Sequence, residues 1–184
     1  MKTALTRLGT ALIWTGLATL TSVLYGVVND QITVTLSPEY FSVFKRAQFG
    51  PALEAAGLSQ SPVRVQAVLV GALATWWFGC FLGAVLSSIG LTDRRCPLPT
   101  RDFLRAVIGI MLFTLCLSFF SCLAAYAAEP VIKPTAEGWP FLAGIRTVRA
   151  AFSVGWWHNA AYLRGVLGTI LACVWVRKRR VLLA

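Results

Sequence analysis

Residues 106–128 read AVIGIMLFTLCLSFFSCLAAYAA, which is 23 consecutive positions without a charged side chain. At a helical rise of about 1.5 Å per residue the run is about 34 Å long, enough to cross the hydrocarbon core of a bilayer. Runs 8–28 and 65–91 share this character, and a shorter run, 165–176, extends back through Arg164 to about residue 155. The sequence therefore predicts an all-α membrane protein, a single domain over 1–184, with four transmembrane helices at approximately 8–28, 65–91, 104–128 and 155–176.

The composition supports a membrane location. Apolar residues make up 57% of the chain and charged residues 13%, against roughly 45–50% and 25% in soluble domains. The net charge of +10 would suggest nucleic acid in a soluble protein. Here the basic residues stand at the ends of apolar runs, which is typical of membrane orientation and of contact with anionic headgroups. We therefore expect the lipid bilayer and anionic lipid headgroups as partners, and no nucleic acid.

Lysines and arginines are distributed unequally between the two ends of the predicted helices. Six of them lie in the long loops 29–64 and 129–154. Ten flank the opposite end: Lys2, Arg7, Arg94, Arg95, Arg101, Arg105, Arg177, Lys178, Arg179 and Arg180. The positive-inside rule then predicts cytoplasmic N- and C-termini in a bacterial inner membrane. The alternative for 8–28 is a cleaved signal peptide, but the run is longer than a usual signal core and no Ala-x-Ala site follows it.

Small residues recur at helical spacing on each predicted helix. The second helix carries Gly79 and Gly83, and the fourth carries Gly165 and Gly168. Small residues at this spacing allow helix backbones to approach closely in lipid. We therefore expect a compact bundle, and the same faces would suit a homo-oligomer or an accessory subunit of another membrane protein.

The outer loops carry local structure signals. Residues 31–37 alternate polar and apolar side chains, which predicts a short strand. Ser37, Pro38 and Glu39 then read as the start of a short interfacial helix with an aromatic face. Trp139 and Pro140 precede a second segment, containing Arg146 and Arg149, that is interpreted as another interfacial helix.

Polar residues are predicted to gather at the outer ends of the first and fourth helices. His158 shares a helical face with Gly165 and Gly168, so it should point into the bundle. The first helix ends at a similar depth. The candidate site, an outward-facing polar pocket, comprises Asn29, Asp30, Gln31, Glu39, His158, Asn159 and Tyr162.

The chemistry of this site has several interpretations. Asp30, Glu39 and His158 are a conceivable three-ligand metal set or a proton-transfer pair, while each alone can serve a purely structural role. No cofactor is predicted, and a metal ion is the weaker alternative. Arg164 lies inside the fourth helix, off the small face. It either extends to the membrane boundary or pairs with Asp30, Glu39 or an anion.

Sequence motifs favour a non-enzymatic protein without deciding the question. The cysteines, Cys80, Cys96, Cys116, Cys122 and Cys173, form no Cys-x-x-Cys pair, so neither a disulfide nor a zinc knuckle is predicted. No phosphate-binding loop, nucleophile elbow or His-Glu-x-x-His sequence is present.

Several short motifs together resemble one family. They are Tyr25-Gly26-x-x-Asn29-Asp30-Gln31-Ile32-Thr33, Ser37-Pro38-Glu39-Tyr40-Phe41, Ala74-Thr75-Trp76-Trp77-x-Gly79 and His158-Asn159-Ala160-Ala161-Tyr162-Leu163. This combination, which covers all four helices, resembles a family of bacterial multi-pass membrane proteins of uncharacterised activity. The resemblance implies fold and location only. In that family histidine often stands where this chain has Asn29, and its absence removes a potential metal ligand.

Three functions follow as hypotheses. The first is a non-enzymatic inner-membrane protein that binds a ligand or serves as an accessory or oligomeric subunit. The second is a metal-binding protein or enzyme using Asp30, Glu39 and His158. The third is a small transporter, which is disfavoured because the uncharged runs 65–91 and 106–128 contain no ionisable Asp, Glu, Lys, Arg or His to mark a path.

Overall fold

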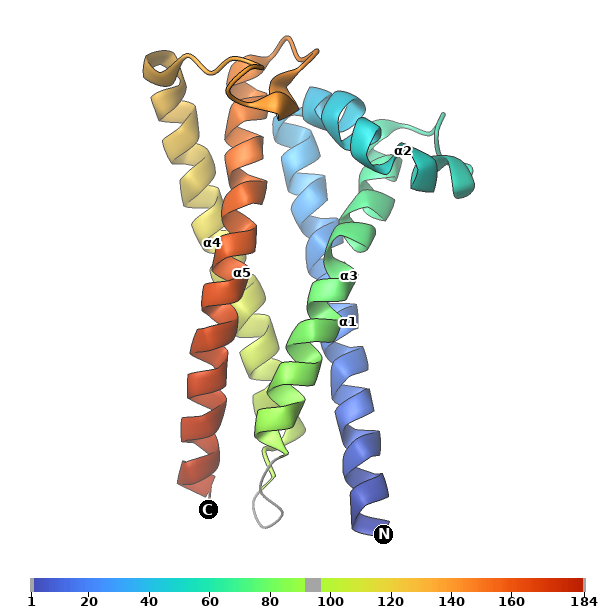
Figure 1. Ribbon diagram of the computed structural model, residues 1–184, viewed down its shortest axis with the longest axis vertical. Coiled ribbons are helices and arrows are strands. Elements are labelled where there is room, and N and C mark those ends of the chain that lie inside the picture. Colours follow the sequence, from blue (N-terminus) through green and yellow to red (C-terminus); the bar gives the residue numbers. More distant parts are fainter. Residues whose placement is uncertain (1, 92–96, 184) are drawn as a thin grey trace.

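Four long helices make up most of the molecule. The computed structural model describes residues 2–91 and 97–183, so the predicted roles of Arg94, Arg95 and Cys96 lie outside the described residues. The long helices are α1 (Lys2–Leu36), α3 (Val63–Gly90), α4 (Thr100–Ile132) and α5 (Val148–Leu183). Each is long and apolar enough to cross a membrane. The N-terminal part of α1 and the C-terminal part of α5 lie at the same end of the bundle (Figure 1). The predicted all-α four-helix bundle is thus confirmed.

The predicted strand at 31–37 is wrong, because α1 continues to Leu36 instead of ending near residue 28. The hydroxyl of Thr33 donates to the Asn29 carbonyl at 3.0 Å, and that of Thr35 donates to the Gln31 carbonyl at 2.8 Å. The buried positions are Asn29, Asp30, Thr33, Val34 and Ser37, which recur with helical and not alternating period. Within the described residues there are helices and connecting turns, and no strand.

Two shorter helices follow α1 and lie across the outer end of the bundle (Figure 1). They are η1 (Tyr40–Lys45), wound as a π-helix, and α2 (Arg46–Ala55). The backbone N–H of Tyr40 donates to the Ser37 hydroxyl at 3.3 Å, as expected for the predicted helix start. Tyr40 and Phe41 are buried, so the predicted aromatic face packs onto the bundle.

The second predicted interfacial helix is reduced to a single 3₁₀ turn, η2 (Pro140–Leu142). Arg149 lies instead in the first turn of α5, which begins at Val148 and not near residue 155. At the other outer corner α4 continues past Pro130 to Ile132. At their outer ends α1, α4 and α5 therefore continue beyond the uncharged runs of the sequence. Packing against the outer loops stabilises these additional helical turns.

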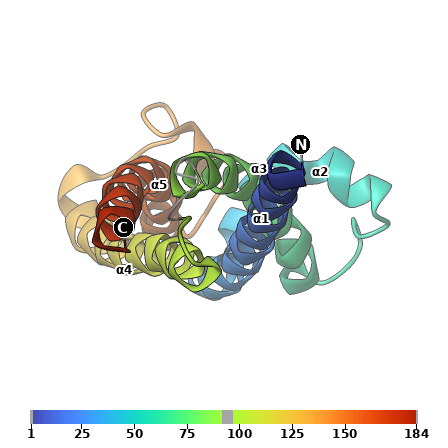
Figure 2. The same ribbon diagram turned by 90° about the horizontal axis from the view of Figure 1, so that it is seen from below.

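The long helices pack as two pairs, α1 with α3 and α4 with α5, and the pairs meet more loosely (Figure 2). A Cβ atom at Gly79 would lie 2.5 Å from the Thr19 Cα, and one at Gly83 would lie 2.6 Å from the Thr15 Cα. The expected close approach is therefore present between α1 and α3. Gly165 and Gly168 differ, since they face side chains of Phe78 and Ile110 and not a backbone.

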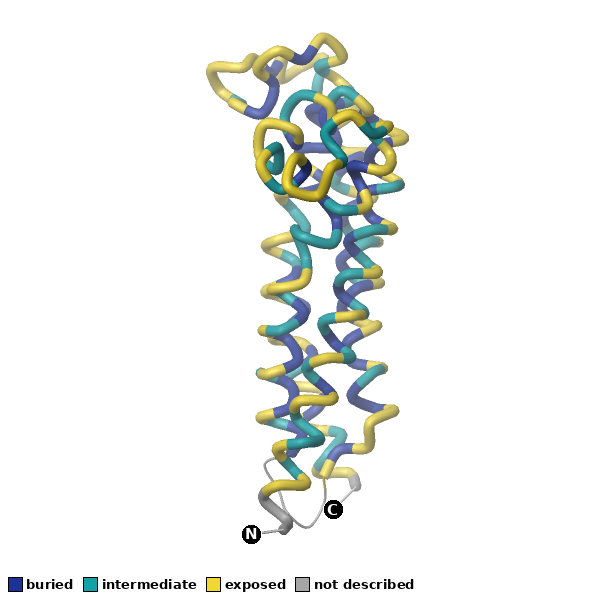
Figure 3. Tube along the Cα trace, turned by 90° about the vertical axis from the view of Figure 1, so that its right-hand side faces the viewer, coloured by how far each residue is buried: buried dark blue, intermediate teal, exposed yellow. Residues whose placement is uncertain are grey.

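Two apolar clusters fill the bundle, one at each end. Trp14 stacks on Phe103 with ring centroids 4.5 Å apart near the termini. Tyr40, Phe141 and other aromatic residues pack together under the outer loops. Exposed positions recur along the outer faces of the long helices (Figure 3), as expected for surfaces that contact lipid. Between these two clusters, side chains fill the space between the helix pairs less completely. The cavity described below lies there.

Candidate functional site

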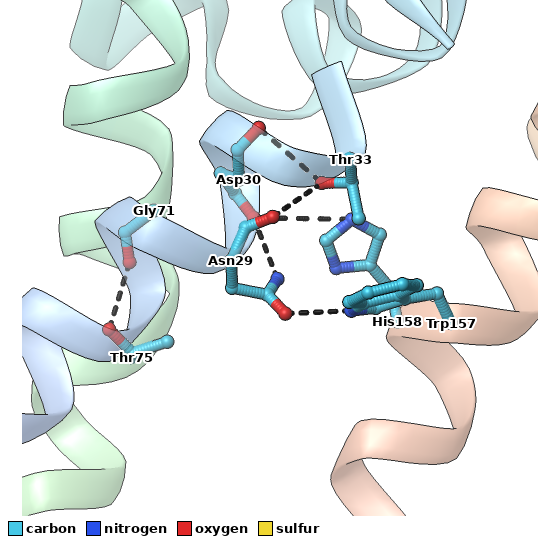
Figure 4. Close-up of polar contacts among 7 residues, drawn as sticks. All are labelled: Asn29, Asp30, Thr33, Gly71, Thr75, Trp157 and His158. Atoms are coloured by element: carbon cyan, nitrogen blue, oxygen red, sulfur yellow. Dashed lines mark hydrogen bonds and ion pairs between the residues drawn. The ribbon is translucent and has the colours of Figure 1, made fainter. Parts of the chain in front are cut away.

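Asp30 of α1 and His158 of α5 meet at the outer end of the bundle, as the sequence predicted. The His158 Nε2 atom lies 4.0 Å from the Asp30 Oδ1 atom, which is longer than a hydrogen bond. Asn29 joins the same two helices: its Oδ1 accepts a 2.7 Å hydrogen bond from the Trp157 indole, and its Nδ2 donates to Asp30 at 3.1 Å (Figure 4). These contacts hold α1 against α5 through buried polar groups.

Lys45 of η1, which the sequence analysis did not single out, lies within electrostatic range of this cluster. It forms no ion pair with the described Asp30 side chain, and its amine stands 5.5 Å from the centroid of the Phe49 ring. Its side chain is only 3% exposed. Burial lowers the pKa of the Lys45 amine below its ordinary value, and the negative charge of Asp30 partly opposes that shift. Lysine is almost never fully buried unless paired, so the residue type of Lys45 argues against burial. Its position four residues after Phe41, on the predicted aromatic face, is the sequence signal that indicates an inward orientation.

The cluster is closed to water, in contrast to the predicted outward-facing pocket. Asp30 is 2% exposed and His158 is 9% exposed. The Tyr40 ring lies on the imidazole of His158, with centroids 5.5 Å apart and planes 5° apart. Asp30 Oδ2 and His158 Nε2 have no hydrogen-bond partner. We call Asp30, Lys45 and His158, with Asn29 beside them, the outer buried cluster.

Glu39 does not join the outer buried cluster. Its carboxylate accepts hydrogen bonds from the backbone N–H groups of Arg146 and Thr147 at 2.9 and 2.8 Å, and from the Thr147 hydroxyl at 2.6 Å. The predicted convergence of Asp30, Glu39 and His158 is therefore wrong, because Glu39 caps the segment that leads into α5. Across the described ranges no group of three or more His, Cys, Asp or Glu side chains is placed to hold a metal ion.

The remaining residues of the predicted site lie apart. The Gln31 side chain donates to the backbone carbonyl of Arg64 at 2.9 Å, joining α1 to α3. Asn159 is exposed on α5. Tyr162 is half-exposed and lies further along α5, where it lines a cavity between the helix pairs.

Arg164 has partners that the sequence analysis did not consider. Its guanidinium donates to the hydroxyls of Ser118 and Ser121 on α4. The arginine therefore neither extends freely to the membrane boundary nor pairs with Asp30 or Glu39. It joins α4 to α5 inside the membrane, where hydrogen bonding lowers the cost of burying the charge.

A cavity of about 280 Å³ lies in the middle of the bundle, between the α1–α3 and α4–α5 pairs. Its mouth is formed by half-exposed side chains, among them Trp77, Phe81, Tyr162 and Val166, so it opens sideways toward lipid. Residues from all four long helices line it: Ser22, Tyr25, Ala74, Thr75, Trp77, Phe78, Phe81, Met111, Thr114, Ala161, Tyr162, Gly165 and Val166. We call it the lateral cavity.

The lateral cavity is apolar apart from a few hydroxyl groups. Ser22 and Thr75 are satisfied, since Ser22 donates to the Thr75 carbonyl at 2.9 Å and Thr75 donates to the Gly71 carbonyl at 2.8 Å (Figure 4 draws the second of these bonds). The hydroxyls of Tyr25 and Thr114 are buried and have no hydrogen-bond partner. Buried polar groups in proteins normally have partners, so these two hydroxyls, which belong to side chains that line the cavity, are unsatisfied in the structure.

A buried carboxylate at the opposite end of the bundle was also missed by the sequence analysis. Asp102 of α4 is 1% exposed. It accepts hydrogen bonds from Arg105 at 3.0 Å and from Arg179 of α5 at 3.1 Å, and Arg101 lies 3.9 Å away. The charge of Asp102 therefore holds arginines of α4 and α5 together near the chain termini.

Replacing Glu39 by glutamine should loosen the start of α5. Hydrogen bonds from the Thr147 hydroxyl and from the two backbone N–H groups hold the pKa of the Glu39 carboxyl below its ordinary value of 4.5. A lowered folded-state pKa means that the stabilisation is complete above pH 4.5 and is lost as pH falls through the lowered value. Hydrogen–deuterium exchange at residues 146–150 should therefore become several-fold faster in Glu39→Gln, and in wild-type protein the protection factors of these amides, which correct for the slower intrinsic exchange in acid, should fall at low pH.

Glu54→Gln, at an exposed glutamate of α2, is the matched control and should leave that exchange unchanged. Equal exchange at residues 146–150 in wild-type protein and Glu39→Gln would contradict the capping role of Glu39.

Two of the motifs behind the predicted family resemblance meet in space, because Asp30 of the first lies 4.0 Å from His158 of the last. That proximity follows from the fold, and family membership stays a prediction. No protein-family model, no curated protein and no solved structure matches this chain.

Proposed function

We propose that this chain is a non-enzymatic protein of the bacterial inner membrane that binds a lipid-soluble molecule in its lateral cavity. This proposal rests on the cavity of about 280 Å³ and on two buried hydroxyls that have no hydrogen-bond partner, those of Tyr25 and Thr114. Its volume is near the lower end of the roughly 300–1,000 Å³ of small-molecule sites. Cytoplasmic termini follow from the positive-inside rule, with the long outer loops facing away from the cytoplasm.

The walls of the lateral cavity favour binding over catalysis. The lining residues include hydroxyls but no carboxylate, imidazole, amine or thiol. A hydroxyl nucleophile needs an adjacent general base to activate it, and this lining contains none. The outer buried cluster does contain Asp30 and His158, but both are packed away from solvent. A membrane enzyme using them is therefore the less supported function.

The ligand we propose has an apolar body and a hydrogen-bond-accepting oxygen such as a carbonyl. The apolar body matches the side chains of Phe78, Phe81 and Met111 in the wall. The accepting oxygen would take hydrogen bonds from the hydroxyls of Tyr25 and Thr114 once these side chains turn toward the ligand, because both oxygens are buried and have no other partner. Because the mouth faces the lipid, such a molecule would enter from the bilayer.

Binding of a benzoquinone with a ten-carbon tail, measured by quenching of Trp77 fluorescence, tests this proposal. The Trp77 signal is isolated as the difference from Trp77→Phe. Each net hydrogen bond contributes about 0.5–1.5 kcal/mol, so Tyr25→Phe and Thr114→Val should each weaken binding by about two- to tenfold.

Tyr126→Phe removes a hydroxyl outside the cavity and should bind like wild-type protein. Saturable binding that is equal in all four proteins would overturn the assignment of the hydroxyls. No saturable quenching in wild-type protein would overturn the site for this ligand class.

A further inference from the structure

A groove on the α4–α5 seam is lined mostly by small and apolar residues. Its volume is about 370 Å³, and Gly109, Ile110, Phe113, Gly168 and Trp175 are among the residues that line it. A Cβ atom added at Gly109 would meet nothing within 4 Å, so the groove is open at that point. Leu171 and Trp175 on its wall are exposed, and the groove therefore faces the surrounding lipid. Its lining covers about two turns of each helix, from residue 105 to 113 on α4 and from 168 to 175 on α5, so the groove runs along the helix axes as an extended hydrocarbon chain would.

Positive charge lies at one end of this groove. Arg105 lines it, and the Arg105 side chain is 59% exposed although it is hydrogen-bonded to Asp102. Arg101 and Arg179 are directed at the same carboxylate. Three guanidinium groups around one carboxylate leave a surplus of positive charge. Trp175 lies at the same end of the groove, in the position where tryptophan side chains favour the membrane interface.

We propose that this groove binds one phospholipid with an anionic headgroup. The phosphate would be held by Arg105 and Arg101, since guanidinium groups form strong, paired hydrogen bonds with phosphate oxygens. One acyl chain would lie along the groove over Gly109. Asp102 acts as a positioning residue, because its carboxylate orients Arg105 and Arg179 without contacting the lipid. This site is separate from the lateral cavity and does not depend on the function proposed for that cavity.

Brominated phospholipids test the proposal in full-length protein reconstituted into bilayers. Bromine on the acyl chains quenches nearby tryptophan, and the Trp175 signal is the difference from Trp175→Phe. Brominated phosphatidylglycerol should quench Trp175 at about fivefold lower mole fraction than brominated phosphatidylcholine with the same chains, the effect of about one basic residue near an anionic surface. Equal quenching by the two lipids would overturn the proposal, as would no quenching, which would indicate that a protein segment covers the groove.

Three variants separate the headgroup contact from the chain contact. Arg105→Gln should abolish the preference for phosphatidylglycerol, while Arg105→Lys, which keeps the charge, should retain most of it. Gly109→Leu should fill the groove and reduce quenching by both lipids. Arg46→Gln on α2 and Gly16→Leu on the far part of α1 are the matched controls and should behave like wild-type protein. A preference that survives Arg105→Gln would exclude Arg105 as the headgroup contact.

Discussion

Gly83→Leu is expected to cause a large loss of stability. A Cβ at Gly83 would lie 2.6 Å from the Thr15 Cα and 3.0 Å from the Ala18 Cβ. The nearest of these atoms belongs to the backbone of α1, so the helices would have to separate along the seam that holds α1 to α3. Overpacking typically costs about 1–3 kcal/mol, and a clash with backbone should fall at or above the upper end of that range.

Thermal unfolding in mild detergent, followed by tryptophan fluorescence, measures this loss. The matched control is Gly16→Leu on α1, where an added Cβ meets nothing within 4 Å. Alanine variants sharpen the comparison, because Gly16→Ala should stabilise the helix by about 1 kcal/mol while Gly83→Ala should destabilise the bundle. If substitutions at Gly16 and Gly83 change the unfolding temperature by the same sign and size, α1 and α3 do not approach as closely as described.

Asp30→Leu is expected to have the second large effect, because it leaves the buried Lys45 amine without its negative neighbour. Lys45 is 3% exposed, and the charge of Asp30 favours its protonated form. Asp30 and Lys45 form no direct ion pair, so the loss should be smaller than the ~3–5 kcal/mol typical of breaking a buried pair, and replacing both groups by apolar ones is often neutral. The double variant Asp30→Leu/Lys45→Met should therefore be more stable than Asp30→Leu alone.

A double-mutant cycle in the same unfolding assay measures the coupling between these two residues. Lys45→Met alone should also be destabilising, since it leaves the Asp30 carboxylate buried. If the loss of unfolding free energy in the double variant equals the sum of the losses in the two single variants, Asp30 and Lys45 are not coupled. That result would contradict the outer buried cluster as an electrostatic unit.

Much of the architecture can be read from local patterns. The uncharged runs 8–28, 65–91 and 106–128 predict helices because an unpaired backbone polar group is too costly in lipid. The Gly79 and Gly83 spacing indicates a close helix contact without any knowledge of the partner helix. Helical period and membrane depth, which are both properties of the sequence alone, predict that Asp30 and His158 lie at one place.

The limits of these patterns are clearest at the helix ends. Alternation over 31–37 predicts a strand, but Asn29, Asp30 and Thr33 bury a helical face against α5 and the outer segments. Packing against residues more than 100 positions away outweighs the weak strand preference of a short segment. For the same reason Glu39 is directed to Arg146 and Thr147 and not toward His158.

Contacts between distant segments determine the rest. The partners of Arg164 and of Asp102 depend on how α4 packs on α5, the burial of Lys45 depends on how η1 packs on the bundle, and the lateral cavity depends on how the two helix pairs meet. Helical period and charge counts describe each helix by itself, so they identify membrane spans and inward faces. They carry no information on the distance and angle between helices, and that geometry decides which polar groups find partners and which, like Tyr25 and Thr114, do not.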